Sequence, residues 1–328
     1  MDEEVSIMFN FSEDVIYPEA APYEEQLRTL REKLVQADAV LVGAGAGLST
    51  AAGLSYGGER FRKYFFDFAE KYGMKDMYTG GFYPFPSPEV YWAWWSRNIY
   101  FNRYVDAPLD VYPTLRRLVE AKDYFVLTTN VDHQFQRSGF DKRRLFYTQG
   151  DYGLLQSVQP EVARTYDNRE MVEAMLEAQG FVRGADGIFE VPSSGKLKTV
   201  VPKELVPICP DDGRAMMVSV RIDGRFVEDE GWHVAQARYK AFLAAHADDH
   251  ILYLELGVGL NTPVIIKYPF WYYTKKNPNA FYASINLGGA ACTTAIRRRS
   301  LCLEADIGKV LHDLANVSEG SATRGVIA

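Results

Sequence analysis

Short apolar runs that end at Gly, Asn or Asp alternate with helical patterns along this chain, and this alternation constrains the fold more than any other feature. The runs predicted as buried strands cover residues 39–42, 124–128, 251–256, 281–285 and 301–303. Strands that alternate with helices form parallel sheets, and such sheets bind their ligands where the strands end. The sequence therefore predicts an α/β fold with a Rossmann-like, doubly wound parallel sheet.

Two long insertions interrupt the alternation, and we expect them to form a second, smaller lobe. Residues 56–105 combine helical patterns with many aromatic side chains, whereas the periodicity of residues 151–230 is weak. Within the second insertion, Leu197–Val201 and Met216–Ile222 are predicted strands. Dense aromatic clusters usually pack in a core, and this applies to three tryptophans: Trp92, Trp94 and Trp95.

The domain boundaries follow from these interruptions. The sheet domain is predicted to comprise residues 23–55, 106–150 and 231–318, and the lobe residues 56–105 and 151–230. An extended N-terminal arm (1–22) and a C-terminal tail (319–328) complete the chain.

Composition excludes several classes of function. The net charge of −7 disfavours a nucleic-acid-binding protein, because phosphate neutralisation needs a basic face. No run of 18 apolar residues predicts a membrane span, and the acidic start at Met1–Glu4 does not resemble a signal peptide. Three scattered cysteines do not form a disulfide framework. A cytoplasmic protein is the expectation.

The segment Gly43–Gly53 is the strongest single motif. A strand followed by Gly-x-Gly-x-Gly and a helix turn brings backbone N–H groups close to a phosphate, and a Cβ atom would block that approach. A tight strand–helix turn without a ligand is the alternative. A dehydrogenase would also need a second strand that ends in an acidic residue, but Asp67 lies in a helical pattern. The motif therefore argues against hydride transfer but not against a dinucleotide.

Five segments together resemble the sirtuins. Gly45–Leu54 looks like their first motif, and Thr129-Asn130-Val131-Asp132 is similar to their Gln-Asn-Ile-Asp motif. Gly257-Val258-Gly259 resembles their Gly-Thr-Ser turn, Ile285-Asn286 their Ile-Asn pair, and Asp306-Ile307 the turn on the adenine side. The segments stand in the family's order and span about residues 37–315.

The resemblance implies NAD as the cofactor and assigns roles residue by residue. Three residues are implied to be catalytic: Asn130, Asp132 and Gln149. Ten others are implied to bind the cofactor: Gly45, Ala46, Gly47, Ser49, Gly53, Thr129, Gly257, Gly259, Asn286 and Asp306. Of these, Asn286 and Asp306 would contact the adenosine half, which would lie towards Gly257 and Asn286.

Two departures from ordinary sirtuins point to one branch. Ser55-Tyr56-Gly57-Gly58 replaces Pro-Asp-Phe-Arg, and Gln149-Gly150 stands where the catalytic His-Gly pair is expected. Both features resemble the class M sirtuins, a microbial branch associated with ADP-ribosylation. For that branch the resemblance implies a lipoylated carrier protein as acceptor and a macrodomain hydrolase as the reversing partner.

The residue chemistry agrees with transfer of ADP-ribose. Asn130 can position a ribose or a water, and Asp132 can hold the nicotinamide carboxamide, although both residue types also favour helix N-termini. Deacetylation needs a base that accepts a proton near neutral pH, which a histidine can do and Gln149 cannot. A lysine deacylase or NAD glycohydrolase is the alternative enzyme, and a non-catalytic NAD sensor is a third reading. His133 is expected to face away from the site.

The sirtuin zinc lobe is degenerate in this sequence. Sirtuins use two Cys-x-x-Cys pairs, but here Cys209 keeps one cysteine of the second pair and Asp212 takes the place of its partner. Ser157 and Glu161 occur where the first pair is expected. Structural zinc takes four ligands, usually thiolates. The sequence therefore predicts a zinc-ribbon-like part without metal, with a mixed Cys/Asp/Glu/His site as the alternative.

Overall fold

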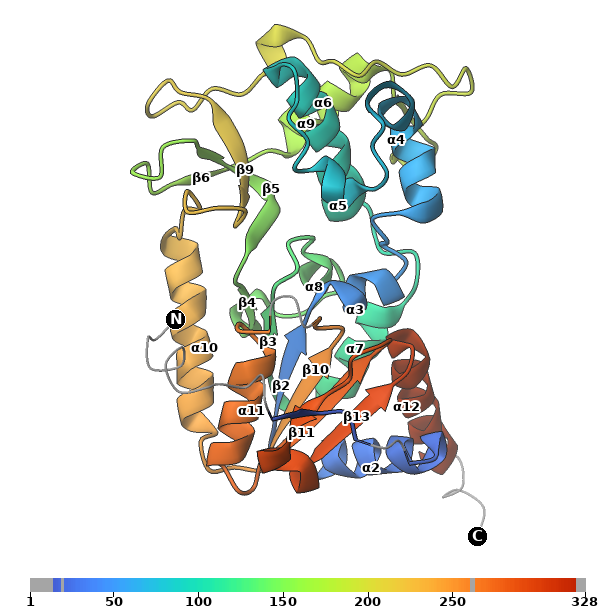
Figure 1. The fold of residues 1–328 in the computed structure, drawn as a ribbon, viewed down its shortest axis with the longest axis vertical. Coiled ribbons are helices and arrows are strands. Elements are labelled where there is room, and N and C mark those ends of the chain that lie inside the picture. Colours follow the sequence, from blue (N-terminus) through green and yellow to red (C-terminus); the bar gives the residue numbers. More distant parts are fainter. Residues whose placement is uncertain (1–13, 19–20, 260–262, 323–328) are drawn as a thin grey trace.

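A six-stranded parallel sheet forms the centre of the larger domain (Figure 1). The structure is a computed structural model that describes residues 14–18, 21–259 and 263–322. In spatial order the strands are β13 (Ser300–Glu304), β11 (Phe281–Asn286), β10 (Ile251–Leu256), β2 (Ala39–Ala44), β3 (Asp123–Thr128) and β4 (Leu145–Tyr147). The predicted doubly wound sheet is confirmed, and the chain order reverses between β2 and β10.

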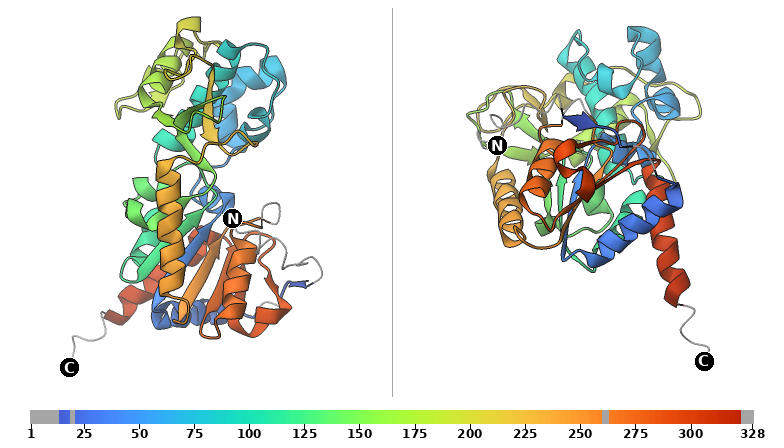
Figure 2. Two further views of the ribbon diagram at one scale, coloured as in Figure 1. Left: turned by 90° about the vertical axis from the view of Figure 1, so that its left-hand side faces the viewer. Right: turned by 60° about the horizontal axis from the view of Figure 1, so that its bottom comes forward.

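Helices cover both faces of this sheet (Figure 2). Alternate residues of β2 point to opposite faces, so Val40 packs against one layer and Leu41 against the other. The first layer contains α2 (Tyr23–Gln36), α7 (Val111–Val119) and α12 (Ile307–Ala322). The second contains α10 (Glu230–Ala245) and α11 (Lys267–Lys276). Burial on both faces explains why the strand sequences are continuously apolar.

The two insertions form the lobe, which lies beyond the carboxyl ends of the strands (Figures 1 and 2). Its helices are α4 (Gly58–Tyr72), α5 (Met77–Gly80), α6 (Pro88–Ile99), a π-helix (Tyr100–Tyr104) and α9 (Arg169–Gln179). Its strands are β5 (Gly150–Ser157), β6 (Thr165–Asp167), β7 (Val182–Arg183), β8 (Phe189–Glu190) and β9 (Met216–Val220). The three tryptophans of α6 are buried, as predicted.

Three short elements connect the domains or extend them. The helix α3 (Ala46–Ala51) follows β2, and α8 (Gln134–Arg137) follows β3. In the N-terminal arm, β1 (Val15–Ile16) pairs antiparallel with β12 (Cys292–Thr293). The other predictions for the arm and the tail fall largely outside the described residues. Within the described ranges, no helix is both long and apolar enough to span a membrane.

Some predicted elements differ from the structure. The strand predicted at 197–201 is absent, because the backbone there bonds to helices: Lys198 N–H donates to the carbonyl of Gln179, and its own carbonyl accepts from Arg97. The sequence patterns also missed β4, α9 and α11. Asp67 does lie inside α4, where its carboxylate pairs with Arg97 rather than ending a strand.

Candidate functional site

A cavity of about 770 Å³ lies where the sheet strands end and the lobe begins. Residues that follow five strands of the sheet line its sheet side, which fits ligand binding at the switch point of an open α/β sheet. Eleven of the thirteen predicted site residues line this cavity: Gly45, Ala46, Gly47, Ser49, Thr129, Asn130, Asp132, Gln149, Gly257, Gly259 and Asn286. The structure therefore brings most of the predicted set together.

The glycine loop packs directly on the turn after β10. Gly47 N–H donates to the carbonyl of Gly257 at 3.0 Å, and Gly45 N–H donates to that of Leu256 at 3.0 Å. A Cβ atom on Gly47 would lie only 2.6 Å from the Gly257 Cα atom. Glycine is required because the two backbones touch, and the same absence of side chains leaves the loop open to a phosphate group.

Ser49 is the centre of a buried hydrogen-bond cluster. Its hydroxyl donates to Asp132 Oδ2 at 2.5 Å and accepts from Asn130 Nδ2 at 3.1 Å. Because the single serine proton goes to the carboxylate, the hydroxyl of Tyr112, 2.9 Å away, donates to Ser49. Tyr112 extends from α7 and had no signal in the sequence beyond its place on an amphipathic helix.

The side-chain amide of Asn130 is fixed in one orientation. Its Nδ2 atom donates to the carbonyl of Gly45 at 2.9 Å as well as to Ser49. Both amide protons are therefore used within the protein, so Asn130 offers its carbonyl oxygen Oδ1 to a ligand. A partial negative charge at this position suits a group that becomes electron-poor during bond cleavage.

Asp132 is buried beside Asn130. Burial raises the pKa of its carboxyl above the usual value, although hydrogen bonds from Ser49 and from the backbone N–H of Gln134 act in the opposite direction. The second of these bonds, at 3.2 Å, satisfies the first residue of α8. Asp132 therefore accepts a hydrogen bond at the start of α8, as the helix-terminus alternative expects, and it also lines the cavity.

Replacing Asp132 with Asn should stabilise the protein at pH 8 while removing activity. A carboxyl with a raised pKa in the fold costs stability at higher pH, where it is charged, and this cost disappears as the pH falls through the raised pKa. The melting temperature of the variant should exceed that of the wild type at pH 8, and the difference should shrink on acidification.

Asp141 provides the control, because hydrogen bonds from the Arg143 side chain and backbone lower its pKa to about 2. Asp141→Asn should therefore not raise the melting temperature at pH 8. An Asp132→Asn variant that melts below the wild type at pH 8 would show that the pKa of Asp132 is not raised in the folded protein.

Gln149 lies in the turn between β4 and β5 and lines the cavity. Its carbonyl accepts from Arg221 N–H at 2.9 Å. The next residue, Gly150, has φ +99°, and a Cβ atom there would lie 2.1 Å from the carbonyl oxygen of Ser219. The backbone of Gln149 and Gly150 is therefore fixed against the end of β9 and the residue that follows it.

Two predicted cofactor residues do not line the cavity. Gly53 has φ +89° and ends the turn after α3, where a Cβ atom would clash with Pro108. Asp306 accepts from Lys309 N–H at 2.8 Å, as a capping residue of α12 does. Their roles in cofactor binding stay predictions.

The expectation that His133 faces away from the site agrees with the cavity lining, which does not include this residue. Its side chain is nevertheless buried, lies 3.1 Å from Asp151 through Nε2 and stacks on Tyr147. Its backbone is left-handed, with φ +55°, so it precedes α8 instead of continuing a helical pattern.

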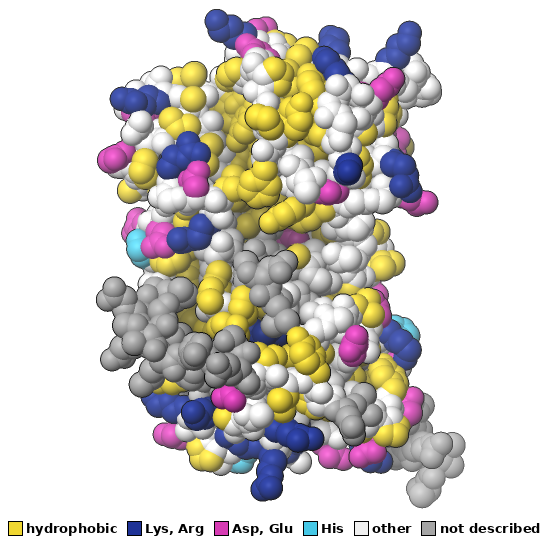
Figure 3. Space-filling view, in the orientation of Figure 1, with side chains coloured by type: hydrophobic (Ala, Val, Ile, Leu, Met, Phe, Trp, Pro, Cys, Tyr) yellow, Lys and Arg dark blue, Asp and Glu magenta, His cyan; other side chains and the backbone are white. Residues whose placement is uncertain are grey.

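The lobe contributes a second wall that the sequence did not reveal. The hydroxyls of Tyr56 and Tyr152 lie 3.2 Å apart, and both side chains line the cavity with Asn98 and Trp95. Further lining residues on this side include the apolar side chains of Met77, Tyr78, Phe82 and Ile222 and the polar side chains of Asn102 and Arg221. Hydrophobic side chains also gather over the lobe in the face drawn in Figure 3. The many aromatic residues in 56–105 were the one sequence signal for this wall, but they were interpreted as the core of the lobe.

Hydrogen bonds occupy the region where sirtuins bind zinc. Ser157 Oγ donates to Asp212 at 2.6 Å, and Cys209 Sγ lies 3.6 Å from the hydroxyl of Tyr166. Over the described part of the chain, no three His, Cys, Asp or Glu side chains cluster as metal ligands would.

We expect purified protein to contain clearly less than one zinc per chain, because three of the four thiolates are missing. Elemental analysis checks this directly, and chelator treatment should leave the melting temperature unchanged. One tightly held zinc per chain, or unfolding by the chelator, would overturn the expectation.

Two curated relatives identify the family of the chain. The chain is 37% identical over 289 residues to the protein ADP-ribosyltransferase of Staphylococcus aureus, which covers 88% of this chain and 86% of the relative. It is 32% identical over 249 residues to a probable bifunctional ADP-ribose hydrolase/ADP-ribosyltransferase of Fusarium oxysporum, and spans 39% of that longer protein. No protein-family model matches the chain.

Solved structures show the same fold. A Sir2 homologue in complex with NAD superposes with a TM-score of 0.57 at 13% identity, covering 94% of this chain and 99% of the other. A sirtuin from a study of substrate affinity gives a TM-score of 0.56 at 16% identity, with 90% and 98% coverage. At these identities the likeness establishes the fold alone.

Proposed function

Because the chain belongs to the protein ADP-ribosyltransferases of the sirtuin fold, we propose that its cavity binds NAD and transfers ADP-ribose to a protein acceptor. One observation carries this proposal: the glycine loop, Asn130, Asp132 and Gln149 meet in a single cavity. The cavity volume and the side-chain-free loop fit an extended dinucleotide. The adenosine half would lie towards Gly257 and Asn286.

The cavity residues divide the cleavage step between them. The fixed Oδ1 of Asn130 faces the position where positive charge develops as the glycosidic bond to nicotinamide breaks. Asp132, held by Ser49, accepts a hydrogen bond from the nicotinamide carboxamide. Neither residue has to change protonation state during this step, and the cluster around Ser49 keeps both in place before the substrate arrives.

Gln149 favours transfer over deacylation. Its carboxamide can hold the ribose or the acceptor by hydrogen bonds but cannot accept a proton at pH 7. Gln149→Ala should lower transfer about tenfold, because one hydrogen bond is worth about 1–2 kcal/mol. Gln149→His restores a titratable base, and we expect weak deacylase activity in that variant when acetylated peptides are assayed. Wild-type deacetylation as fast as transfer would contradict the assignment.

A lipoylated carrier protein is our proposed acceptor. The apolar side of the cavity suits a long hydrophobic modification: Tyr78 and Phe82 line it while remaining 63% and 59% exposed. A macrodomain hydrolase is the proposed reversing partner. The Fusarium relative supports this pairing, since its name joins an ADP-ribose hydrolase to the transferase.

Labelled NAD tests the proposal. The protein is incubated with a carrier protein in lipoylated and unmodified forms, and intact-mass spectrometry measures ADP-ribose on each. We expect modification of the lipoylated form only, and its removal by an added macrodomain hydrolase. Equal labelling of both forms would reject the lipoyl requirement. Calorimetry without NAD or ADP-ribose binding at millimolar ligand would reject the cavity as the NAD site.

A further inference from the structure

His133 has the one strained backbone among the non-glycine residues that the structure describes. Its φ is +55° and its ψ 26°, in the left-handed region that glycine adopts without cost. Such conformations persist where surrounding structure enforces them, and they are concentrated at functional sites. Glycine would serve this turn better if only the backbone mattered, so the imidazole itself needs an explanation.

The imidazole is held on three sides. Its ring stacks on Tyr147, with centroids 3.8 Å apart and planes 11° from parallel. Its Nδ1 atom lies 2.6 Å from Gln136 Oε1, and Nε2 lies 3.1 Å from Asp151 Oδ2. The side chain is 11% exposed and does not line the cavity. It is therefore placed to act on Asp151, not on a ligand.

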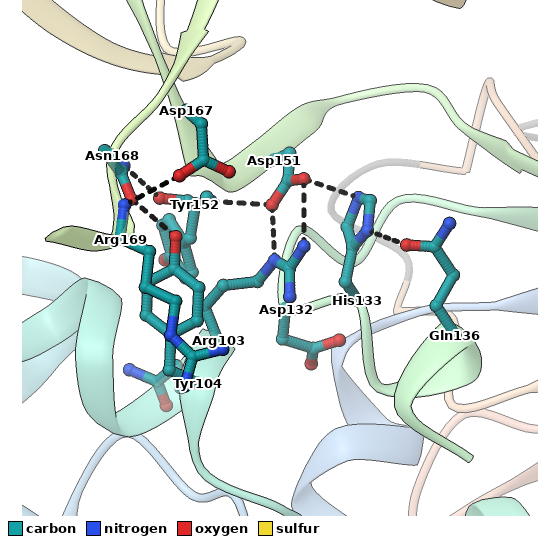
Figure 4. A network of polar contacts seen from close by, with 12 residues as sticks. Arg103, Tyr104, Asp132, His133, Gln136, Asp151, Tyr152, Asp167, Asn168 and Arg169 are labelled. Carbon is teal, nitrogen blue, oxygen red and sulfur yellow. Dashed lines mark hydrogen bonds and ion pairs between the residues drawn. The ribbon is translucent and has the colours of Figure 1, made fainter. Parts of the chain in front are cut away.

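Asp151 joins the sheet domain to the lobe (Figure 4). Its Oδ1 atom accepts from Arg103 Nε at 2.7 Å and from Gly153 N–H at 2.6 Å. Arg103 belongs to the π-helix after α6, whereas His133 follows β3. Burial alone raises the pKa of Asp151, but the adjacent His133 and Arg103 hold it below the usual value. The carboxylate is therefore charged and bound from both sides.

The network fixes Asp151, the second residue of β5, which lies two residues after Gln149. Next to Asp151, Tyr152 N–H donates to the carbonyl of Val131 at 2.9 Å, which belongs to the Asn130–Asp132 loop. On the lobe side, Asn168 Nδ2 donates to the carbonyl of Tyr152 at 2.8 Å, and Asn168 Oδ1 accepts from the hydroxyl of Tyr104 at 2.7 Å. Only Gly150 separates Gln149 from this anchored stretch.

We infer that His133 is a positioning residue, whose imidazole together with Arg103 holds Asp151 and thereby fixes Gln149 at the cavity. This inference rests on the function proposed for Gln149. It also explains the strained turn. The left-handed backbone at His133 places the ring between the Asn130–Asp132 loop and the turn that contains Gln149. The two catalytic segments are thus held in one geometry.

The His133→Gly variant distinguishes a positioning role from a merely structural one. His133→Gly removes the ring but relieves the left-handed strain, so the packing lost with the buried ring is partly offset and the melting temperature should fall only slightly. We expect transfer to fall about tenfold, while nicotinamide release changes less than about twofold, because only the Gln149 turn loses its support. Asp151→Asn should shift the ratio of transfer to release in the same direction. His250→Ala, which removes an exposed histidine, is the control.

A double-mutant cycle tests whether His133 influences ADP-ribose transfer through Gln149. If His133 acts through Gln149, the double variant His133→Gly/Gln149→Ala should transfer no less than Gln149→Ala alone. Additive losses, or equal falls in transfer, release and melting temperature after His133→Gly, would overturn the inference. If Gln149→Ala lowers transfer and His133→Gly does not, the inference alone is wrong. If Gln149→Ala has no effect, the role proposed for Gln149 is wrong and the inference falls with it.

Discussion

Replacing Asn130 with Ala should reduce nicotinamide release from NAD by about 10³-fold or more, because bond cleavage precedes every possible outcome of the reaction. The variant loses the oxygen that we propose faces the developing positive charge, and the loop also loses the bonds from Nδ2 to Gly45 and Ser49. Transfer and any side hydrolysis should fall by the same factor. Release of labelled nicotinamide measures the common step directly.

The comparison with Asn286→Ala separates chemistry from binding. Asn286 lines the same cavity from the end of β11, and its Nδ2 atom donates to the carbonyl of Val258 at 3.4 Å. We expect that variant to raise KM for NAD with little change in kcat, whereas Asn130→Ala should mainly lower kcat. Calorimetry should still detect NAD binding to Asn130→Ala. Release within tenfold of the wild type would remove Asn130 from the catalytic role.

The sheet could be predicted because its strands are buried on both faces. The local sequence alone identifies these strands, because each is a continuous apolar run: β2, β3, β10, β11 and β13. By contrast, β4 has three residues and lies at the sheet edge, so its sequence carries little signal. The segment 197–201 is apolar in part, but its hydrogen bonds depend on α9 and Arg97, which are distant in sequence.

The sheet side of the site was predictable for a related reason. Asn130 and the glycines each follow a strand, and the carboxyl ends of parallel strands meet at one edge. The lobe side was not predictable. Tyr56 and Tyr152 come from different insertions and meet only through tertiary packing. The left-handed turn at His133 was also hidden, because the residues after it read as an ordinary helix.

Replacing Lys267 with Met should destabilise the protein by about 3–5 kcal/mol, because it leaves a buried carboxylate without its countercharge. Lys267, at the start of α11, pairs with Glu255 in β10, and neither side chain has any exposed surface. Glu255 also accepts from the hydroxyls of Tyr282 and Ser284, each at 2.9 Å. Denaturant unfolding measures the loss.

Two further variants identify the unpaired charge as the cause. Lys275→Met removes the same charge from the exposed end of α11 and should leave the free energy of unfolding almost unchanged. Adding Glu255→Gln to Lys267→Met should recover part of the loss, since the amide is neutral and its oxygen still accepts from Ser284 or Tyr282. Glu255 lies two residues before Gly257, so NAD affinity should follow the same order as stability. If Lys267→Met is no less stable than Lys275→Met, the buried pair does not support this edge of the cavity.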